Sequence, residues 1–177
     1  ALLDDHDLEV RRLAVAFLVR HGDGEPELAR ALENPHPRIR NAALAFLARS
    51  PQVVQEGLVD TEEICRFLEE DSPAGAEGRT VLAEWLGARD VDDETCWRRL
   101  LEDEDPRVVA AAMAGLGRRG EPSFLPWLVE TLDDRRLRGA ARRALAAYGE
   151  RSLPALMALL RDDGAPDLRR ASVPLVL

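Results

Sequence analysis

The chain has 177 residues, of which 46% are hydrophobic and only 5% aromatic, so it can form a sizeable core of leucine, alanine and valine. All 24 basic residues are arginines, which excludes mechanisms that need a lysine Schiff base or a P-loop lysine. The net charge of −9 argues against nucleic-acid binding, because phosphate contacts need clustered positive charge. Helix formers are abundant and strand-favouring residues sparse, which predicts an all-α fold.

One sequence pattern recurs along the chain. An aliphatic anchor is followed four positions later by alanine and eight positions later by leucine, as in Val10, Ala14 and Leu18. Four copies keep this pattern, and two weaker copies begin at Gly78 and Leu168. Successive anchors lie 29, 39, 30, 29 and 31 residues apart, which indicates a repeat architecture. In chain order the anchors are Val10, Ile39, Gly78, Val108, Leu137 and Leu168.

A second apolar segment follows the first in the clear copies. In residues 125–132 and 153–160, apolar side chains recur at i, i+3 or i+4, and i+7, which is one face of a helix. Gly120 and Gly149 fall where a C-cap glycine should end the first helix of the pair. The alanine of the first segment leaves room for a neighbouring helix to approach closely. Each repeat is therefore predicted to be two helices of about 10–14 residues that stack on the next pair.

We therefore predict an α-α superhelix, or solenoid, of about six helical-hairpin repeats that form one array over residues 1–177. The third repeat is expected to be irregular, because the anchor spacing before it rises to 39 residues. The chain ends in an apolar run, from which we expect it to be a fragment of a longer protein. The repeats are expected at residues 1–33, 34–70, 71–102, 103–132, 133–162 and, in part, 163–177.

The turns before three of the first helices carry an Asp or Asn six positions before an arginine, and Asp103 stands six positions before Val109 in a fourth. The pairs are Asp5/Arg11, Asn34/Arg40 and Asp163/Arg169. This spacing, the short period and the Leu-Pro-x-Leu second helices resemble HEAT repeats, in particular the HEAT-like class first named from phycobilisome lyase subunits. The resemblance covers nearly the whole chain; it is weakest at residues 50–80, and Val109 replaces one arginine. It implies a ladder of Asp and Arg side chains along the turns and second helices that line a concave face.

The C-terminal part carries a second resemblance. The segment that runs from Tyr148 through Leu153-Pro154 to Val173-Pro174 is similar to the HEAT segment of bacterial nucleotide-transporter-like membrane proteins. This resemblance implies a cytoplasmic appendage of a membrane transporter. The chain has no run of about 18 apolar residues, so we expect no direct membrane insertion of this segment.

The histidines and cysteines could carry chemistry, but we favour structural roles for both. His6, His21 and His36 lack the His-x3-His or Glu-x-x-His spacing of a zinc site, so we interpret them as solvated residues. Cys65 and Cys96 lack a CxxC motif or an adjacent histidine. Stacked helices lie about 8–10 Å apart, from which we expect these cysteines to be beyond disulfide reach and to be small core residues. Two cysteines are too few for a disulfide framework, which favours a reducing, cytoplasmic compartment.

Two groups of charged residues also have structural interpretations. The acidic runs at 92–94 and 102–105 lack the alternating ligands and central glycine of an EF-hand, so we interpret them as residues at helix N-termini. The densest basic group could bind an acidic partner, but we favour a solvated helix face paired with neighbouring acids. It consists of Arg135, Arg136, Arg138, Arg142 and Arg143. We accordingly predict no catalytic residues, no cofactor and no metal site.

Trp127 is the one aromatic residue that we assign to partner binding. It lies off the apolar stripe of its helix, opposite Ala155 in the next repeat, so it is either a contact residue or a partly buried rim residue. Glu130 lies beside it, one turn along the open face. Residues 56–105 carry 17 acids and 5 arginines, a net charge of −12, which predicts an acidic surface and a basic protein or peptide partner.

These features predict a non-catalytic protein–protein interaction scaffold in the cytoplasm, which the second resemblance extends to a transporter appendage. The alternative is an enzyme or nucleic-acid binder of the HEAT-like class, either a lyase or a DNA glycosylase. A glycosylase of this kind should have a basic concave face with interleaved aromatic residues, and the acidic composition argues against it. The fold alone does not decide between these functions, and the oligomeric state is left open.

Overall fold

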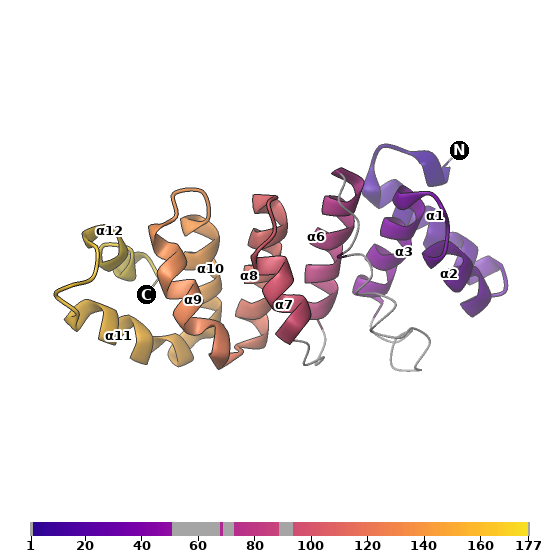
Figure 1. Ribbon diagram of the computed structural model, residues 1–177. Helices are drawn as coiled ribbons and strands as arrows, with labels where there is room; N and C mark the ends of the chain where they lie inside the picture. The colour runs from indigo at the N-terminus through magenta and orange to yellow at the C-terminus, as the bar shows by residue number, and fades with distance from the viewer. Residues whose placement is uncertain (1, 51–67, 69–72, 89–93, 177) are drawn as a thin grey trace.

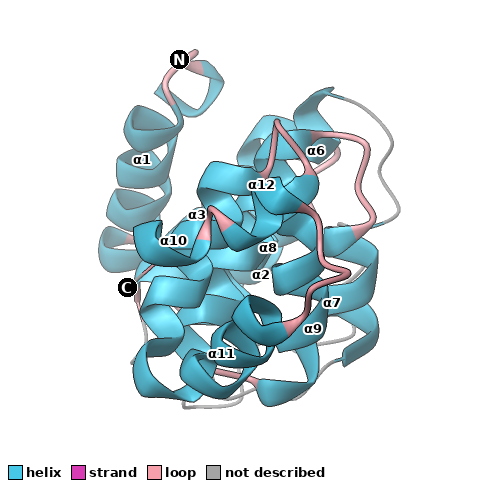
Figure 2. Ribbon diagram, turned by 90° about the vertical axis from the view of Figure 1, so that its left-hand side faces the viewer, coloured by secondary structure: helices cyan, strands magenta, loops and turns pink. Residues whose placement is uncertain are grey.

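The structure is a computed structural model that describes residues 2–50, 68, 73–88 and 94–176. Within these ranges the chain forms helices and no strand, which confirms the predicted all-α fold. Figure 2 shows the same content of helices and connecting loops.

Two layers of helices run along an elongated array whose termini lie at opposite ends (Figure 1). The first helices of the repeats pack side by side, α1 on α3, α3 on α6, α6 on α8 and α8 on α10, and the second helices α2, α7, α9 and α11 form the other layer. The α-helices are α1 (Leu8–His21), α2 (Glu25–Leu32), α3 (Pro37–Arg49), α6 (Pro73–Gly87), α7 (Glu94–Leu101), α8 (Pro106–Arg119), α9 (Leu125–Glu130), α10 (Arg138–Tyr148), α11 (Leu153–Arg161) and α12 (Asp167–Arg170). The 3-10 segments are η1 (Leu2–Asp4), η3 (Pro122–Phe124), η4 (Thr131–Asp133), η5 (Gly149–Ser152) and η6 (Val173–Leu175).

Local sequence signals set the ends of the first helices. Gly120 follows α8 with φ +67°, and its N–H donates to the Leu116 carbonyl at 2.8 Å. Gly149 follows α10 with φ +58°. Both confirm the predicted C-caps, because glycine reaches positive φ without the steric cost of a Cβ. At the N-termini of α1 and α8, the side chains of Asp7 and Asp105 accept the backbone N–H two residues later, at 2.8 and 2.9 Å.

Small residues bring the first helices close together. Ala43, Ala112 and Ala141, the alanines of the repeat pattern, are fully buried. A Cβ added to Gly87 of α6 would lie only 2.5 Å from the Cα of Gly115 on α8. The backbones of these two helices therefore touch, which supports the interpretation that the pattern keeps this interface free of large side chains.

Two arginines, Arg79 and the predicted ladder residue Arg11, join different repeats. Arg79 of α6 pairs with Asp103 in the turn before α8, and both side chains are largely buried. Arg11 of α1 reaches across the second repeat to Glu77 of α6, with 2.7 Å between Nη2 and Oε1. The Arg11 side chain is 2% exposed, so its charge is compensated inside the stack. These ion pairs tie a repeat to the next one and to the one after it.

The structure corrects the interpretation of the cysteines. Cys96, in the first turn of α7, is disulfide-bonded, and the prediction that it lies beyond disulfide reach is wrong. The separation of helix axes does not limit the distance between facing residues: each Cα lies about 2.3 Å from its axis, so facing Cα atoms on adjacent helices can be about 4–5 Å apart. Cys65 lies outside the described residues.

Candidate interaction surface

The predicted contact residues Trp127 and Glu130 both lie on α9, in the second-helix layer. Glu130 is exposed at the end of the helix. Trp127 is partly buried and packs against the hydrophobic core. Its carbonyl accepts the Thr131 hydroxyl at 2.8 Å, a side-chain bond that accompanies the change from α9 to the tighter turn η4. The indole therefore presents part of its surface, and its role in binding stays a prediction.

An ion pair on α7 lies next to an aromatic ring that precedes α9. The Arg98 guanidinium of α7 lies 5.9 Å from the centroid of the Phe124 ring in η3, which is within cation–π range. Arg98 Nε also donates to Glu94 Oε1 at 2.9 Å. Phe124 is buried, whereas Arg98 and Glu94 are exposed. The contact links the second-helix layers of two repeats and places both charge signs on the surface.

The predicted acidic character of this surface rests largely on residues outside the described ranges. Ten of the 17 acids in residues 56–105 lie there. Of the seven that are described, four form ion pairs with arginines: Glu77, Glu94, Asp103 and Asp105. The described part of the surface is mixed in charge, and an acidic middle stays a prediction.

The arginine-rich segment at residues 135–143 has structural partners. Arg138 donates to the carbonyl oxygens of Leu132 and Asp133 at 2.6 and 3.1 Å, which satisfies backbone acceptors at the end of the preceding helical segment. Arg142 donates to a serine hydroxyl of the last repeat at 3.1 Å. These bonds support a structural interpretation of at least two of the five arginines.

All three histidines are exposed. His6 Nδ1 is 3.5 Å from an Arg38 guanidinium nitrogen, and the His21 ring lies 4.4 Å from the Phe17 ring, centroid to centroid. Within the described residues, no group of three or more His, Cys, Asp or Glu side chains could hold a metal ion. None of the helices that the structure describes has the length and apolar content needed to cross a membrane.

Among the described residues, two side chains have strongly shifted pKa values, and both shifts have structural causes. Hydrogen bonds from the side chain and backbone of Arg107 lower the pKa of Asp105 to about 2. Burial raises the pKa of Tyr148 to about 12, and its hydroxyl donates to the Glu121 carbonyl at 2.8 Å. Asp105 caps α8 and Tyr148 anchors the end of α10, so both shifts belong to the scaffold.

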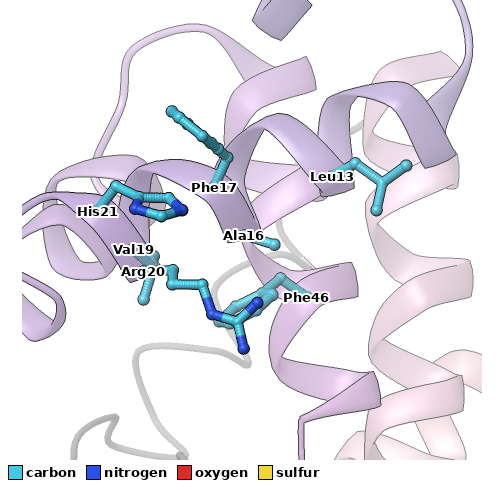
Figure 3. Close-up of a pocket in the computed structure, with 7 residues that line it drawn as sticks. All are labelled: Leu13, Ala16, Phe17, Val19, Arg20, His21 and Phe46. Carbon is cyan, nitrogen blue, oxygen red and sulfur yellow. The ribbon is translucent and has the colours of Figure 1, made fainter.

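The sequence reasoning missed an apolar surface on α1. Leu13, Phe17 and Leu18 are 58%, 62% and 40% exposed, and they line an open groove between α1 and η1. Phe17 and His21 also line an adjoining hollow together with Phe46 of α3 (Figure 3). The residues themselves carry the same pattern as the buried copies. The available signal was Leu13, because the equivalent positions 42, 111 and 140 hold alanine.

Comparison with known proteins supports the repeat architecture. A family model described as HEAT repeats matches residues 61–146 and 97–174, which together cover more than half of the chain. A designed armadillo repeat protein is 16% identical with a TM-score of 0.52, over 99% of this chain and 95% of that protein. An engineered protein of known structure is 18% identical with a TM-score of 0.49, over 99% and 92% of the two chains. No curated protein gives a significant match. At such identity the armadillo protein supports the α-solenoid fold alone.

Proposed function

Because the chain belongs to the HEAT-repeat family, we propose that it is a non-catalytic scaffold that binds a protein or peptide along its second-helix layer. The main support for the proposal is that stacking buries the first helices but leaves side chains of the second helices exposed. The first helices from α3 to α10 bury their repeat positions against one another, whereas the second helices α7, α9 and α11 keep exposed side chains along the array. A long surface of this kind suits an extended partner.

The second-helix layer mixes apolar and charged groups. Leu153 and Met157 of α11 are exposed one turn apart, Trp127 of α9 is partly exposed, and Glu130 is exposed beside it. Aromatic residues surrounded by polar groups are the usual anchors of protein interfaces. We therefore place Trp127 and Glu130 in the contact. The net charge of −12 over residues 56–105 favours a basic partner over DNA.

The finer parts of the proposal rest on sequence resemblance. The Leu-Pro-x-Leu second helices support the phycobilisome-lyase type of HEAT-like repeat, and the segment up to Pro174 supports a cytoplasmic appendage of a membrane transporter. The disulfide at Cys96 weighs against the cytoplasmic part, because disulfides persist mainly in oxidising compartments. The scaffold proposal does not depend on the compartment.

A quenching titration tests the scaffold. Trp85 and Trp97 are 1% and 2% exposed, so iodide quenching of fluorescence reports mainly on Trp127. The probes are an arginine-rich peptide, a glutamate-rich peptide of equal length and a DNA duplex, each at low and at physiological salt. We expect the arginine-rich peptide to bind, to protect Trp127 from iodide, and to bind less tightly at the higher salt concentration.

Variants locate the contact. Binding to the variants is measured by isothermal titration calorimetry, because Trp127→Ala removes the fluorescent reporter. Trp127→Ala and Glu130→Arg should each weaken binding of the arginine-rich peptide at least about tenfold. Glu150→Arg changes another exposed acid, in η5, and serves as the matched control, with no effect expected. Binding of the peptide that survives both α9 variants would place the contact elsewhere. Tighter binding of the duplex than of either peptide would support the nucleic-acid alternative instead.

A further inference from the structure

Three arginines in α10 and the turn before it lack the acidic partners that the sequence led us to expect. The side chains of Arg135, Arg136 and Arg143 are exposed. None of these side chains forms an ion pair or a hydrogen bond with another residue that the structure describes. The carboxylate of the neighbouring Asp134 accepts the backbone N–H of Arg136 at 2.7 Å and pairs with no arginine side chain in the described part of the chain. The positive charge of these arginines is therefore available to a partner.

The neighbouring first helix adds to this positive charge. The helices α8 and α10 each contain three arginines and neither Asp nor Glu. Arg118, in the last turn of α8, is exposed and likewise has no side-chain partner within the described ranges. A Cβ added to Gly117 of α8 would lie 3.0 Å from the Cα of Ala144 on α10, so the two helices are closely packed. Their outward sides therefore form one continuous surface.

The repeat register places the arginines on the same side of the two helices. Ala114 of α8 is equivalent to Arg143, and Ala147 of α10 is equivalent to Arg118, because the anchors of these two repeats lie 29 residues apart. All four of these residues are exposed, so the equivalent positions face solvent on both helices. The arginines stand beside small residues that leave the surface open. We call this surface the arginine face; it consists of Arg118, Arg135, Arg136, Arg143, Ala114 and Ala147.

Packing of the repeats does not require arginine on this face. In α6 the position of Arg143 is held by Glu84, which is exposed there, so the repeat accommodates an acid at this position. Like charges gathered without acids repel one another and lower the stability of the folded chain. A negatively charged partner would remove this repulsion by supplying the missing carboxylates. The composition of the arginine face thus favours a role in binding.

We propose that the arginine face binds a short segment rich in Asp and Glu in an acidic protein partner. A planar guanidinium group donates two parallel hydrogen bonds to a carboxylate, which makes arginine well suited to this ligand. From Arg136 past Arg143 to the level of Arg118, the face extends about 16 Å along the helix axes. An extended segment of about five residues covers this length. The face belongs to the first-helix layer, so this site is separate from the proposed contact at Trp127 on α9.

The charge of the surrounding protein favours an acidic peptide segment over nucleic acid. Exposed acids border the arginine face, Glu84 on the adjacent helix α6 and Glu150 in η5 after α10. A DNA duplex carries one negative charge per about 1.7 Å of its axis, so it would continue past the face and meet these acids. The net charge of −9 adds to the repulsion of a long polyanion. A short acidic segment can end within the arginine face and avoids this repulsion.

The test uses a fluorescein-labelled glutamate-rich peptide, whose binding to the full chain is followed by fluorescence anisotropy at low and at physiological salt. A labelled DNA duplex is titrated in parallel. We expect the peptide to bind and its affinity to fall at the higher salt concentration. It should bind without protecting Trp127 from iodide, and Trp127→Ala should leave its affinity unchanged. These two results separate the arginine face from the contact proposed on the second-helix layer.

Three double variants locate the site. Arg118→Glu with Arg143→Glu should weaken binding of the peptide at least about tenfold. Arg118→Lys with Arg143→Lys keeps the charge and should bind within about threefold of the wild type. The matched control, Arg99→Glu with Arg161→Glu, makes the same change in net charge at two exposed arginines of α7 and α11, in the other layer. It should change the affinity less than about threefold at physiological salt. Circular dichroism checks that all variants are equally helical.

Three results would overturn the proposal. The first is a wild type that does not bind the peptide even at low salt. The second is an equal loss of affinity in the matched control and in Arg118→Glu with Arg143→Glu, because binding would then follow the net charge and no particular face. The third is a duplex that binds more tightly than the peptide and is lost in the same double variant, because the arginine face would then recognise phosphates of a nucleic acid.

Discussion

We expect Gly115→Ala to destabilise the array although it improves helix propensity. Gly115 lies inside α8, where alanine is favoured over glycine by about 1 kcal/mol. A Cβ at this position would lie 2.6 Å from Cη2 of Trp97 and 2.9 Å from the carbonyl oxygen of Ala83. Both neighbours are buried, so they cannot move aside freely, and overpacking should cost about 2–3 kcal/mol. The expected net loss in the free energy of unfolding is about 1–2 kcal/mol.

Gly139→Ala is the matched control. Gly139 lies in the first turn of α10, and the nearest atom to an added Cβ is a guanidinium nitrogen of Arg143 at 3.6 Å, at the end of a flexible side chain. This variant should gain about 0.5–1 kcal/mol, so urea denaturation followed by circular dichroism should separate the two variants by about 2 kcal/mol. Equal stabilisation by both would refute the reasoning, because it would show that α8 and its neighbours can move apart at little cost.

Three further predictions test the packing, the ion pairs and the burial of the tyrosine. Ala141→Leu should lower the free energy of unfolding by roughly 1–3 kcal/mol through overpacking, and a neutral result in urea denaturation would show that the repeat register is wrong. Asp103→Ala removes the carboxylate that pairs with the largely buried Arg79 and should lower the free energy of unfolding by about 3 kcal/mol. Glu94→Ala removes an exposed ion pair and should lower it by less than about 1 kcal/mol. Equal losses in the two variants would contradict this prediction. Tyr148 is the only tyrosine, so tyrosinate absorbance should titrate near pH 12 in the folded protein and near pH 10 in urea. Because the fold favours the neutral phenol, the stability that this group contributes is complete below about pH 10 and is lost as the pH rises toward 12; a folded midpoint near 10 would contradict its burial.

Features that are set by residues close together in the sequence, such as helix ends and buried faces, could be predicted. Gly120 and Gly149 end their helices because glycine alone reaches the required φ without strain, and that requirement is visible in the residue itself. Ala112 and Ala141 are buried because the repeat places them on the side facing the next helix, which the spacing of apolar residues reveals. The all-α solenoid follows from these two signals and needs no information about distant contacts.

Contacts between repeats were not predictable from the repeat pattern. Arg11 pairs with Glu77, two repeats away, although the spacing draws attention to Asp5 in its own turn. A periodic sequence shows which positions are equivalent, but it does not show which copies touch. The disulfide at Cys96 was missed for the same reason, because the distance between two cysteines in different repeats depends on how the layers are placed. Whether Trp127 contacts a partner depends on that partner as well as on this chain, so its role in binding stays a prediction.

The position that Phe17 occupies in α1 also shows that the layers are spaced in two ways. In the C-terminal half this position is held by Gly115 and Ala144, and the backbone of the preceding helix lies against each of them. Such a contact fixes the spacing by backbone atoms and leaves no room for an added Cβ. In α3 the same position holds Phe46, which lines an open hollow with residues of α1, so the spacing there is set by side chains. Phe17 of α1, which is 62% exposed, belongs to the second kind, because an aromatic ring at this position holds any backbone that packs on it at the distance of a side chain.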